Sequence, residues 1–405
     1  MAREPQLFLM LQFWFSPMSL GIYIQVPFCQ TKCTYCNFHT GVVSSARFAP
    51  YAKAVETEIR EHRSRLNVAG VALPASLAAL TVDTVYFGGG TPSLLDPAHL
   101  RAMLNAIRET FPSKFREVTL EADPETVELE KAEAWAAAGI NRVSFGVQSF
   151  SDVELKAAGR LHRRAHIYRA VPILRAASIR NISFDLIAGL PHQTSGSWRN
   201  SLDELIRLAP QHVSIYLLEV DEGSRLGSEL LHGGAKYSAS AVPSDDAMAD
   251  SYDSARHVLT TAGYEHYEIS NFAKPGFASE HNRKYWRREP YLGFGAGAHS
   301  FSSLQRWANA HDSAAYVQSI ASGKVPIEQL ETISSAQSLE EELFLGLRQL
   351  AGIDLNHLQA SYDVPLKDRF TSLESAGLIE RCGSVVRLVP ARLSIANEVF
   401  VELMR

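Results

Sequence analysis

The sequence has few cysteines and little net charge. Four of its 405 residues are cysteines, and the formal net charge is −5. Three of the four lie between Cys29 and Cys36, a spacing unlike the disulfide framework of a secreted protein, so we expect a reducing, cytoplasmic compartment. The small net charge supplies no global basic field for a polyanion, and we expect no nucleic acid among the partners.

Long hydrophobic runs are also missing. The most apolar N-terminal run covers residues 7–15, which is short of the roughly 20 residues that cross a bilayer. No small-residue cleavage site of a secretory signal follows this run. We predict that Met18 is the natural start and that residues 1–17 are an upstream extension, with a frayed N-terminal arm as the alternative.

The composition is that of a folded protein with a large core. Hydrophobic residues make up 46% of the chain and charged residues 20%, which excludes disordered and fibrous classes. Short β-rich runs alternate with amphipathic helical runs up to residue 220. The expected strands are residues 21–26, 84–87, 117–121, 142–145, 182–187 and 213–217. The expected helices are residues 51–65, 97–111, 125–138, 167–177 and 197–208. This alternation predicts an α/β fold with a parallel sheet curved into a partial (β/α)6 barrel, with a doubly wound open sheet as the alternative.

The pattern changes after residue 220. Residues 221–245 are rich in Gly and Ser and predict a long loop, which a helix over 246–262 and a turn-rich aromatic stretch over 263–301 follow. Helices over 340–350, 355–362 and 365–376, a hairpin over 381–388 and a closing helix are expected next. That order is typical of an α+β, winged-helix-like unit, and we favour a cap on the barrel over DNA binding. The expected parts are an extension (1–17), a barrel (18–220), a linker and aromatic region (221–334) and a C-terminal unit (335–405).

The three clustered cysteines carry the clearest chemical signal. Cys29, Cys33 and Cys36 follow the first expected strand as CxxxCxxC. A structural zinc ion needs four ligands, and Cys382 and the scattered histidines offer no paired half-site, so zinc is the weaker interpretation. A [4Fe-4S] cluster held by three cysteines keeps one iron open to an outside ligand. S-adenosylmethionine can chelate that iron and be cleaved to a radical by electron transfer.

Distinctive residues follow several expected strands. In a parallel barrel the ligand-binding groups lie at the carboxyl ends of the strands. Gly89 and Gly90 follow the second strand, where a backbone without side chains allows a ligand to approach closely. Glu121, Gln148 and Asp185 lie at or near the next three strand ends. One such residue is usually a satisfied cap, but their recurrence favours a binding site.

The cysteine spacing, with Tyr35 before the third cysteine, resembles the radical S-adenosylmethionine superfamily, which implies a partial (β/α)6 barrel. Segments 23–29, 88–92 and 159–162 make nearly the whole chain from residue 20 resemble the family of oxygen-independent coproporphyrinogen III dehydrogenase and the heme chaperone HemW. This resemblance implies cluster ligation by Cys29, Cys33 and Cys36 and a HemN-type C-terminal domain. It also implies S-adenosylmethionine contacts from Tyr23, Gly89, Gly90, Thr91, Glu121, Gln148, Arg160 and Asp185, with the Tyr35 backbone near the adenine.

Two features separate the branches of this family. Dehydrogenase-type sequences resemble CxxxCxxCxC and carry a longer N-terminal segment, whereas this chain has Phe38 at the position of the additional cysteine. The segment from His281 to Trp286 is similar to the heme-binding HNxxYW motif of HemW. The resemblance implies heme contacts from His281, Asn282, Tyr285 and Trp286, with His281 as axial ligand. Tyr285 and Trp286 could also be core anchors, and His299 is a weaker candidate ligand.

The resemblance therefore implies a cytoplasmic heme chaperone that binds heme and passes it to an acceptor protein. Its cofactors would be a [4Fe-4S] cluster and an exchangeable S-adenosylmethionine, and we assign no catalytic residue. An electron donor for the cluster is a further expected partner, as is a peripheral membrane contact made through the acceptor. The alternative is an oxidoreductase that decarboxylates coproporphyrinogen III.

Overall fold

The computed structural model describes the chain except residues 1–18, 72–73, 75–76, 78, 367 and 404–405. The predicted start at Met18 and the predicted extension over residues 1–17 lie outside the described residues. In the part of the chain that the structure covers, no helix is both long and apolar enough to cross a membrane.

Six parallel strands form the centre of the fold. They are β1 (Leu20–Val26), β4 (Val82–Gly89), β5 (Ser113–Ala122), β6 (Arg142–Gln148), β7 (Asn181–Ala188) and β8 (His212–Leu217). Adjacent strands in this order pair in parallel, which confirms the six predicted strands. A doubly wound sheet reverses its strand order partway along the chain. Here the six strands lie side by side in sequence order, so the barrel prediction is confirmed.

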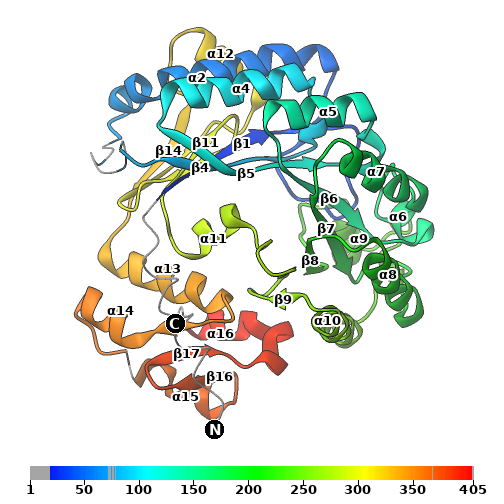
Figure 1. The fold of residues 1–405 in the computed structure, drawn as a ribbon. Coiled ribbons are helices and arrows are strands. Elements are labelled where there is room, and N and C mark those ends of the chain that lie inside the picture. The colour runs from blue at the N-terminus through cyan, green and yellow to red at the C-terminus, as the bar shows by residue number, and fades with distance from the viewer. Residues whose placement is uncertain (1–18, 72–73, 75–76, 78, 367, 404–405) are drawn as a thin grey trace.

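Helices cover the outer face of this curved sheet (Figure 1). They are α2 (Phe48–Val68), α4 (Pro97–Thr110), α5 (Leu129–Ala138), α6 (Asp152–Ala157), α7 (Arg164–Ala176) and α8 (Ser195–Leu208). Alternation along β1 shows why the sheet has two different faces. Ile22, Ile24 and Val26 are fully buried, whereas Tyr23 and Gln25 between them are partly exposed. Apolar side chains thus face one side of the strand, and polar side chains line the inside of the barrel.

Short strands from the aromatic region extend the sheet at both edges. At one edge β11 (Tyr291–Phe294) pairs in parallel with β1, and β12 (His299–Phe301), β13 (Gln305–Asn309) and β14 (Ile327–Thr332) follow as antiparallel neighbours. At the other edge β10 (Asn271–Ala273) and β9 (Glu265–His266) continue from β8. These strands of two to six residues are too short to give a clear periodic signal in the sequence.

One prediction for the region after the barrel was wrong. Residues 221–245 were expected to form a long loop, but α9 (Arg225–His232) lies within them. The Ser224 side chain accepts a hydrogen bond from the Gly227 amide and so caps this helix. The Gly and Ser content of the segment therefore concealed a capped helix. The helix expected over 246–262 is confirmed as α10 (Asp245–Thr261).

The C-terminal unit is a small α+β structure. Its helices are α13 (Ser335–Arg348), α14 (Leu355–Tyr362), α15 (Thr371–Ser375) and α16 (Ala396–Leu403). The predicted hairpin is β16 (Ile379–Cys382) with β17 (Val385–Leu388), and β15 (Ile353–Asp354) adds a third strand. Helix α13 packs on α11 (Glu280–Trp286), which lies on the inner side of the sheet (Figure 1).

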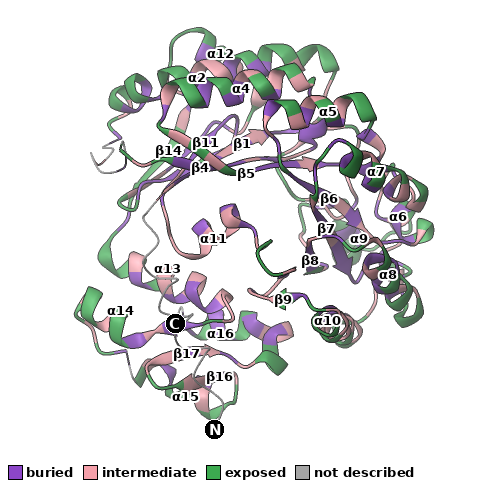
Figure 2. Cartoon of the chain, viewed as in Figure 1, coloured by how far each residue is buried: buried purple, intermediate pink, exposed green. Residues whose placement is uncertain are grey.

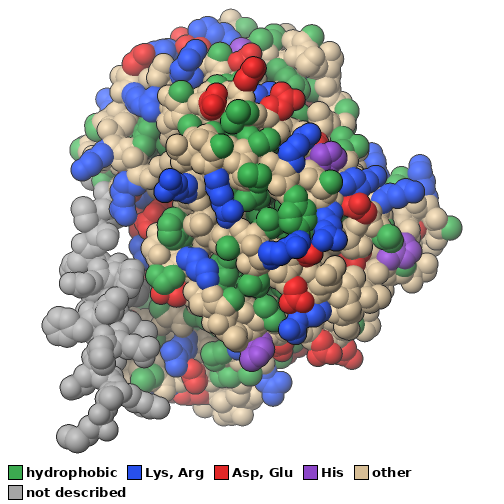
Figure 3. Space-filling model, turned by 45° about the vertical axis from the view of Figure 1, so that its right-hand side comes forward, with side chains coloured by type: hydrophobic (Ala, Val, Ile, Leu, Met, Phe, Trp, Pro, Cys, Tyr) green, Lys and Arg blue, Asp and Glu red, His purple; other side chains and the backbone are tan. Residues whose placement is uncertain are grey.

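Burial follows this layered arrangement. Buried residues run along the strands and along the helix faces that meet the sheet, while the outer helix faces are exposed (Figure 2). The outer face also carries α12 (Ser313–Ala321), which packs on α2. On the face that Figure 3 presents, Lys and Arg side chains are interspersed with Asp, Glu and apolar side chains.

Candidate functional site

The three clustered cysteines lie in one loop above the carboxyl end of β1. Cys29 ends the short strand β2 (Phe28–Cys29), which pairs with β3 (Gly41–Val42), and all three thiols are half-buried. The Thr34 amide donates to the carbonyl oxygen of Ala158 at 3.0 Å, and the Leu226 amide donates to the carbonyl oxygen of Thr34 at 2.8 Å. The loop is therefore held between the ends of α6 and α9.

The thiol chemistry fits an iron–sulfur cluster. Burial raises the pKa of the Cys29 and Cys36 thiols, so both remain protonated until a metal competes for the sulfur. Arg160 Nη1 lies 3.4 Å from Cys33 Sγ and brings a positive charge to the third thiol. Among the described residues, no group of three or more His, Cys, Asp or Glu side chains is positioned to hold a metal ion. A [4Fe-4S] cluster binds its thiolates at different iron atoms, and the thiol donor set of this loop fits it.

Gly89 and Gly90 form a close turn beside the cysteine loop. The Gly90 amide donates to the carbonyl oxygen of Val26 at 2.9 Å, which joins the end of β4 to the end of β1. A Cβ atom at Gly90 would lie 2.5 Å from the carbonyl oxygen of Phe28, and Gly89 has a φ of +107°. Only glycine fits both positions, because the Gln25 side chain fills the Cβ space at Gly89 and the backbone of Val26 and Phe28 fills it at Gly90.

Glu121 links this turn to the inside of the barrel. Its carboxylate accepts a hydrogen bond from the Gly89 amide at 3.0 Å and another from the Tyr86 hydroxyl at 2.9 Å. Burial, together with the nearby charge of Asp185, raises the pKa of Glu121 to about 7. Asp185 accepts from Ser144 Oγ at 3.2 Å, and burial raises its pKa as well. Two carboxylates from separate strands therefore face the same polar interior.

Arg160 connects the cysteine loop to the strand ends. It donates to the Asp123 carboxylate and, at 3.0 Å, to the carbonyl oxygen of Gly146, in addition to its contact with Cys33. Asp123 also accepts from Thr91 Oγ1 at 3.5 Å. The sequence analysis did not select Asp123 as a site residue. Its position two residues beyond Glu121, at the same strand end, is the signal that could have identified it.

The remaining predicted contacts lie in the same area. Gln148 ends β6 with a φ of 63°, and both its amide and Arg160 would contact a Cβ atom at Gly146. The Tyr23 hydroxyl donates to Gln25 Oε1 at 2.8 Å. Tyr35 packs beside the apolar cluster that contains Ala158 and Leu218. The structure therefore brings the predicted cluster ligands and S-adenosylmethionine contacts together at one end of the barrel. They are Cys29, Cys33, Cys36, Tyr23, Tyr35, Gly89, Gly90, Thr91, Glu121, Gln148, Arg160 and Asp185.

The predicted heme motif lies on α11, inside the same barrel, where the His281 and Tyr86 ring centroids are 5.3 Å apart and the Tyr86 hydroxyl donates to Glu121. Glu117 of β5 accepts hydrogen bonds from the amides of Glu280 at 3.0 Å and His281 at 3.1 Å, and from Ser279 Oγ at 3.3 Å. A buried carboxylate thus caps the amino terminus of α11, where it also complements the helix dipole. Nothing in the sequence around Glu117 indicated this role.

His281 is not presented to a ligand in this conformation. Its side chain is 1% exposed, Nδ1 is hydrogen-bonded to Thr84 Oγ1 at 3.0 Å, and Nε2 is hydrogen-bonded to the Tyr285 hydroxyl at 2.9 Å. Burial lowers the pKa of His281 to about 3, so the ring is neutral. Ligation of heme iron by His281 stays a prediction, and in this conformation both ring nitrogens are hydrogen-bonded within the protein.

The other residues of the heme motif also contact the protein, through the backbone amide of Asn282 and the rings of Tyr285 and Trp286, but the buried Nε1 of Trp286 has no hydrogen-bond partner among the described residues. The Asn282 amide donates to Ser279 Oγ at 3.3 Å as part of the helix cap. Tyr285 packs edge-on against Tyr291 with ring centroids 4.7 Å apart. The Arg348 guanidinium lies 4.5 Å from the ring centroid of Trp286. Tyr285 and Trp286 are only partly buried, so heme contact and core anchoring both stay predictions for them.

Comparison with known families identifies two parts of the chain. Residues 23–205 match the model of the Radical SAM superfamily, and residues 333–391 match the HemN C-terminal domain. The fold and the site thus define a radical S-adenosylmethionine protein with a HemN-type C-terminal domain. The fold also resembles that of the coproporphyrinogen III oxidase HemN from Escherichia coli, with a TM-score of 0.80 and 21% identity, covering 99% of this chain and 93% of that one.

Curated relatives narrow the class to a family. The chain is 33% identical over 384 residues to the heme chaperone HemW of Bacillus subtilis, covering 93% of this chain and 97% of that protein. It is 31% identical over 387 residues to the heme chaperone HemW of Lactococcus lactis, covering 94% and 96%. The chain belongs to the HemW family.

Proposed function

We propose that this chain is a heme chaperone. It holds a [4Fe-4S] cluster through Cys29, Cys33 and Cys36, binds S-adenosylmethionine exchangeably beside the cluster, and transfers heme to an acceptor protein. The observation that carries the proposal is the meeting of the thiol loop, the glycine turn and Arg160 at the carboxyl ends of the strands. The names of the relatives supply the heme-transfer part of the proposal.

The residues around the cluster have distinct roles in this proposal. When bound, the cluster supplies an iron with an open position and a route for one electron. Gly89 and Gly90 let the backbone approach the amino-acid part of S-adenosylmethionine, and Arg160 offers a planar guanidinium to its carboxylate. Glu121 and Asp185 are acceptors for amine and hydroxyl donors. A carboxylate with a pKa near 7 can also hold a proton at neutral pH.

Heme binding by the motif on α11 requires a change in the hydrogen bonds of His281. For His281 to ligate iron, it must first give up its hydrogen bond to Thr84 or Tyr285. Heme contacts from Asn282, Tyr285 and Trp286 are further parts of the proposal. The proposal also includes three partners, which are the acceptor protein, an electron donor and a membrane contacted through the acceptor. It further includes a cytoplasmic location and a division of the chain after residues 17, 220 and 334.

The test is anaerobic reconstitution of the cluster, followed by two assays on the same sample. We expect about four iron and four sulfide per chain, saturable heme binding by absorbance, and no turnover of coproporphyrinogen III. Cys33→Ser should lose the iron and sulfide, whereas Cys382→Ser should keep both because that thiol is exposed on β16. Release of carbon dioxide and protoporphyrinogen would overturn the chaperone proposal in favour of the dehydrogenase.

A further inference from the structure

A polar cleft of about 670 Å³ borders the cysteine loop. Thr34, which follows Cys33 in the sequence, forms part of its wall. The other lining residues come from α6, from the residue before α7 and from the segments around His192 and Lys236. The lining consists of Thr34, Asp152, Val153, Lys156, Ala157, Arg163, His192, Lys236, Tyr237 and Ser238. We call this feature the basic cleft.

The end of α6 joins the basic cleft to the cysteine loop. Thr34 Oγ1 donates to the carbonyl oxygen of Ala157 at 3.2 Å, and the Thr34 amide donates to that of Ala158 at 3.0 Å. Gly159 has a φ of +74°, and a Cβ atom there would lie 3.6 Å from the Cα atom of Cys33. A residue that lines the cleft is therefore bonded directly to a predicted cluster ligand and is packed against the end of α6.

Hydrogen bonds fix a second wall of the basic cleft. The Lys236 and Tyr237 amides each donate to Glu229 Oε2 at 2.8 Å. The His192 amide donates to the carbonyl oxygen of Ala241 at 2.8 Å. Both anchored segments belong to the region after the barrel strands β7 and β8. The lining residues are thus held in one arrangement, so the cleft is a formed feature of the surface.

The basic cleft carries positive charge on a chain whose formal net charge is −5. Lys156, Arg163 and Lys236 line it, and Asp152 is the one carboxylate in the lining. Asp152 Oδ1 already accepts a hydrogen bond from the Arg164 amide at 2.8 Å. Both lysines are exposed. A local excess of cations on an acidic protein attracts negatively charged partners and raises the rate at which they associate.

Exposed apolar side chains lie on the elements that border the basic cleft. Val153 on α6, Leu161 before α7 and Leu231 on α9 are 63%, 50% and 60% exposed. Protein interfaces combine an apolar centre with a polar, charged rim. Because the lysines and these apolar side chains are exposed, the surface fits a protein better than a small anion, which is held by groups that enclose it.

We propose that the basic cleft is the docking site of an acidic one-electron carrier protein that reduces the cluster. The inference rests on the proposed function, which includes an electron donor, and deepens it by naming the surface and the charge of that donor. Electron-transfer complexes are transient and bury less than about 1,200 Å², so a few cations and apolar side chains suffice. In one encounter the carrier's reduced centre loses one electron and the bound cluster gains it, and no bond forms or breaks.

The test measures binding and electron transfer separately, with a plant-type [2Fe–2S] ferredoxin as the acidic carrier. Isothermal titration with oxidised ferredoxin gives the affinity without any reaction. Stopped-flow absorbance with reduced ferredoxin gives the rate of electron transfer to the reconstituted protein, and electron paramagnetic resonance identifies the reduced cluster. Photoreduced 5-deazariboflavin, a small uncharged reductant, measures how readily the cluster accepts an electron without docking.

The variant that tests the cleft combines Lys156→Glu with Lys236→Glu. It should bind ferredoxin more weakly and receive its electron more slowly, by about tenfold or more at low ionic strength. The difference should shrink as salt is added, because salt screens exposed charges. Reduction by 5-deazariboflavin should be unchanged. The matched control combines Lys114→Glu with Arg180→Glu, which makes the same change in net charge at exposed positions at the amino ends of β5 and β7. It should behave like the parent.

Three outcomes would overturn the inference. One is equal slowing in both double variants, which would show an effect of net charge alone. Another is a cleft variant that binds ferredoxin and receives its electron like the parent. In that case, a change in its oligomeric state by light scattering would assign the cleft to a second copy of this chain. The third is a parent with a full cluster that does not bind ferredoxin.

Failure of the proposed function gives a different result, because the parent would then hold no cluster after reconstitution. If charge reversal lowers the iron content of the cleft variant, Lys156→Ala with Lys236→Ala takes its place. This milder pair should slow electron transfer from ferredoxin by about threefold. A rate equal to that of the parent would overturn the inference in the same way.

Discussion

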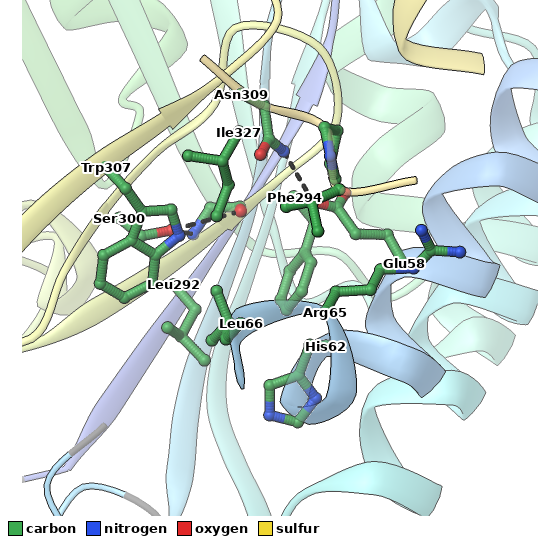
Figure 4. Close-up of a pocket in the computed structure, with 13 residues that line it drawn as sticks. Glu58, His62, Arg65, Leu66, Leu292, Phe294, Ser300, Trp307, Asn309 and Ile327 are labelled. Carbon is green, nitrogen blue, oxygen red and sulfur yellow. Dashed lines mark hydrogen bonds between the residues drawn. The ribbon is translucent and has the colours of Figure 1, made fainter. Parts of the chain in front are cut away.

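Glu58 anchors the rim of the barrel, and its removal should destabilise the protein in a pH-dependent way. The Glu58 side chain on α2 is 6% exposed and borders a cavity of about 20 Å³ with residues of β11 and β13 (Figure 4). Its carboxylate accepts from the Gly295 amide at 2.9 Å, Asn309 Nδ2 at 2.7 Å and the Tyr316 hydroxyl at 2.5 Å. One side chain thus joins α2 to the turn after β11, to β13 and to α12.

Two opposing contributions set the size of the effect of Glu58→Ala. The substitution leaves three buried donors without this acceptor, at about 1–3 kcal/mol each. It also removes a buried charge, since burial raises the pKa of Glu58 from 4.5 to about 7. A shift of that size corresponds to about 3 kcal/mol. We therefore expect the free energy of unfolding to fall by about 3 kcal/mol at pH 8.

The sign of the pH dependence follows from the direction of this shift. Because the pKa of Glu58 is higher in the folded chain than in the unfolded chain, the folded chain binds this proton more tightly. The stabilisation is complete below pH 4.5 and is lost as the pH rises to about 7. Glu58→Ala has no such carboxyl group, so the difference between parent and variant should shrink by about 3 kcal/mol over this range.

Urea unfolding followed by circular dichroism, at several pH values between about 5 and 8, measures both effects. Glu56→Ala is the matched control on the same helix, because Glu56 makes surface ion pairs with Lys53 and Arg60. Such pairs are worth about 0–1 kcal/mol. If Glu58→Ala were as stable as Glu56→Ala at pH 8, or if its deficit did not change with pH, the assignment of Glu58 as a buried anchor would be refuted.

Two further predictions concern the two ends of the barrel. Gly90→Ala should weaken S-adenosylmethionine binding by about tenfold or more, because its Cβ atom would press on the carbonyl oxygen of Phe28. In isothermal titration, Gly196→Ala on α8, where a Cβ atom meets only an ordinary contact at 3.8 Å, should bind like the parent. Equal binding by both variants would contradict a role of the glycine turn in S-adenosylmethionine binding. Glu117→Ala should lower the free energy of unfolding by about 2–3 kcal/mol and speed hydrogen exchange of the α11 amides. If the α11 amides of Glu117→Ala exchange as slowly as those of the parent, contacts other than Glu117 hold α11 in place.

The parts of the fold that could be predicted are those with strong local signals. Six strands and five helices follow from alternation and amphipathic periodicity, because each segment must bury one face against its neighbours. The short strands of the aromatic region could not be predicted in the same way. Strand β11, for example, has four residues, and it is held by pairing with β1 about 270 residues earlier in the chain. Its existence depends on a partner that local sequence does not specify.

The candidate site also has parts that local sequence predicts and parts that depend on distant residues. The cysteine loop, the glycine turn and the strand-end residues were predictable, because in a parallel barrel every strand ends at the same edge. The position of α11 was not predictable, because its cap is Glu117, more than 160 residues away in sequence.

The sequence by itself determined the three thiols, their spacing and the absence of a further cysteine at Phe38, because ligand number and spacing are local properties of the chain. The tertiary structure alone decided the surroundings of His281. It buries this imidazole between Thr84 and Tyr285, and both ring nitrogens are hydrogen-bonded there. The physical reason is that a nitrogen with a satisfied hydrogen bond in a buried site must lose that bond before it can bind iron, and only the packed structure shows which bonds exist.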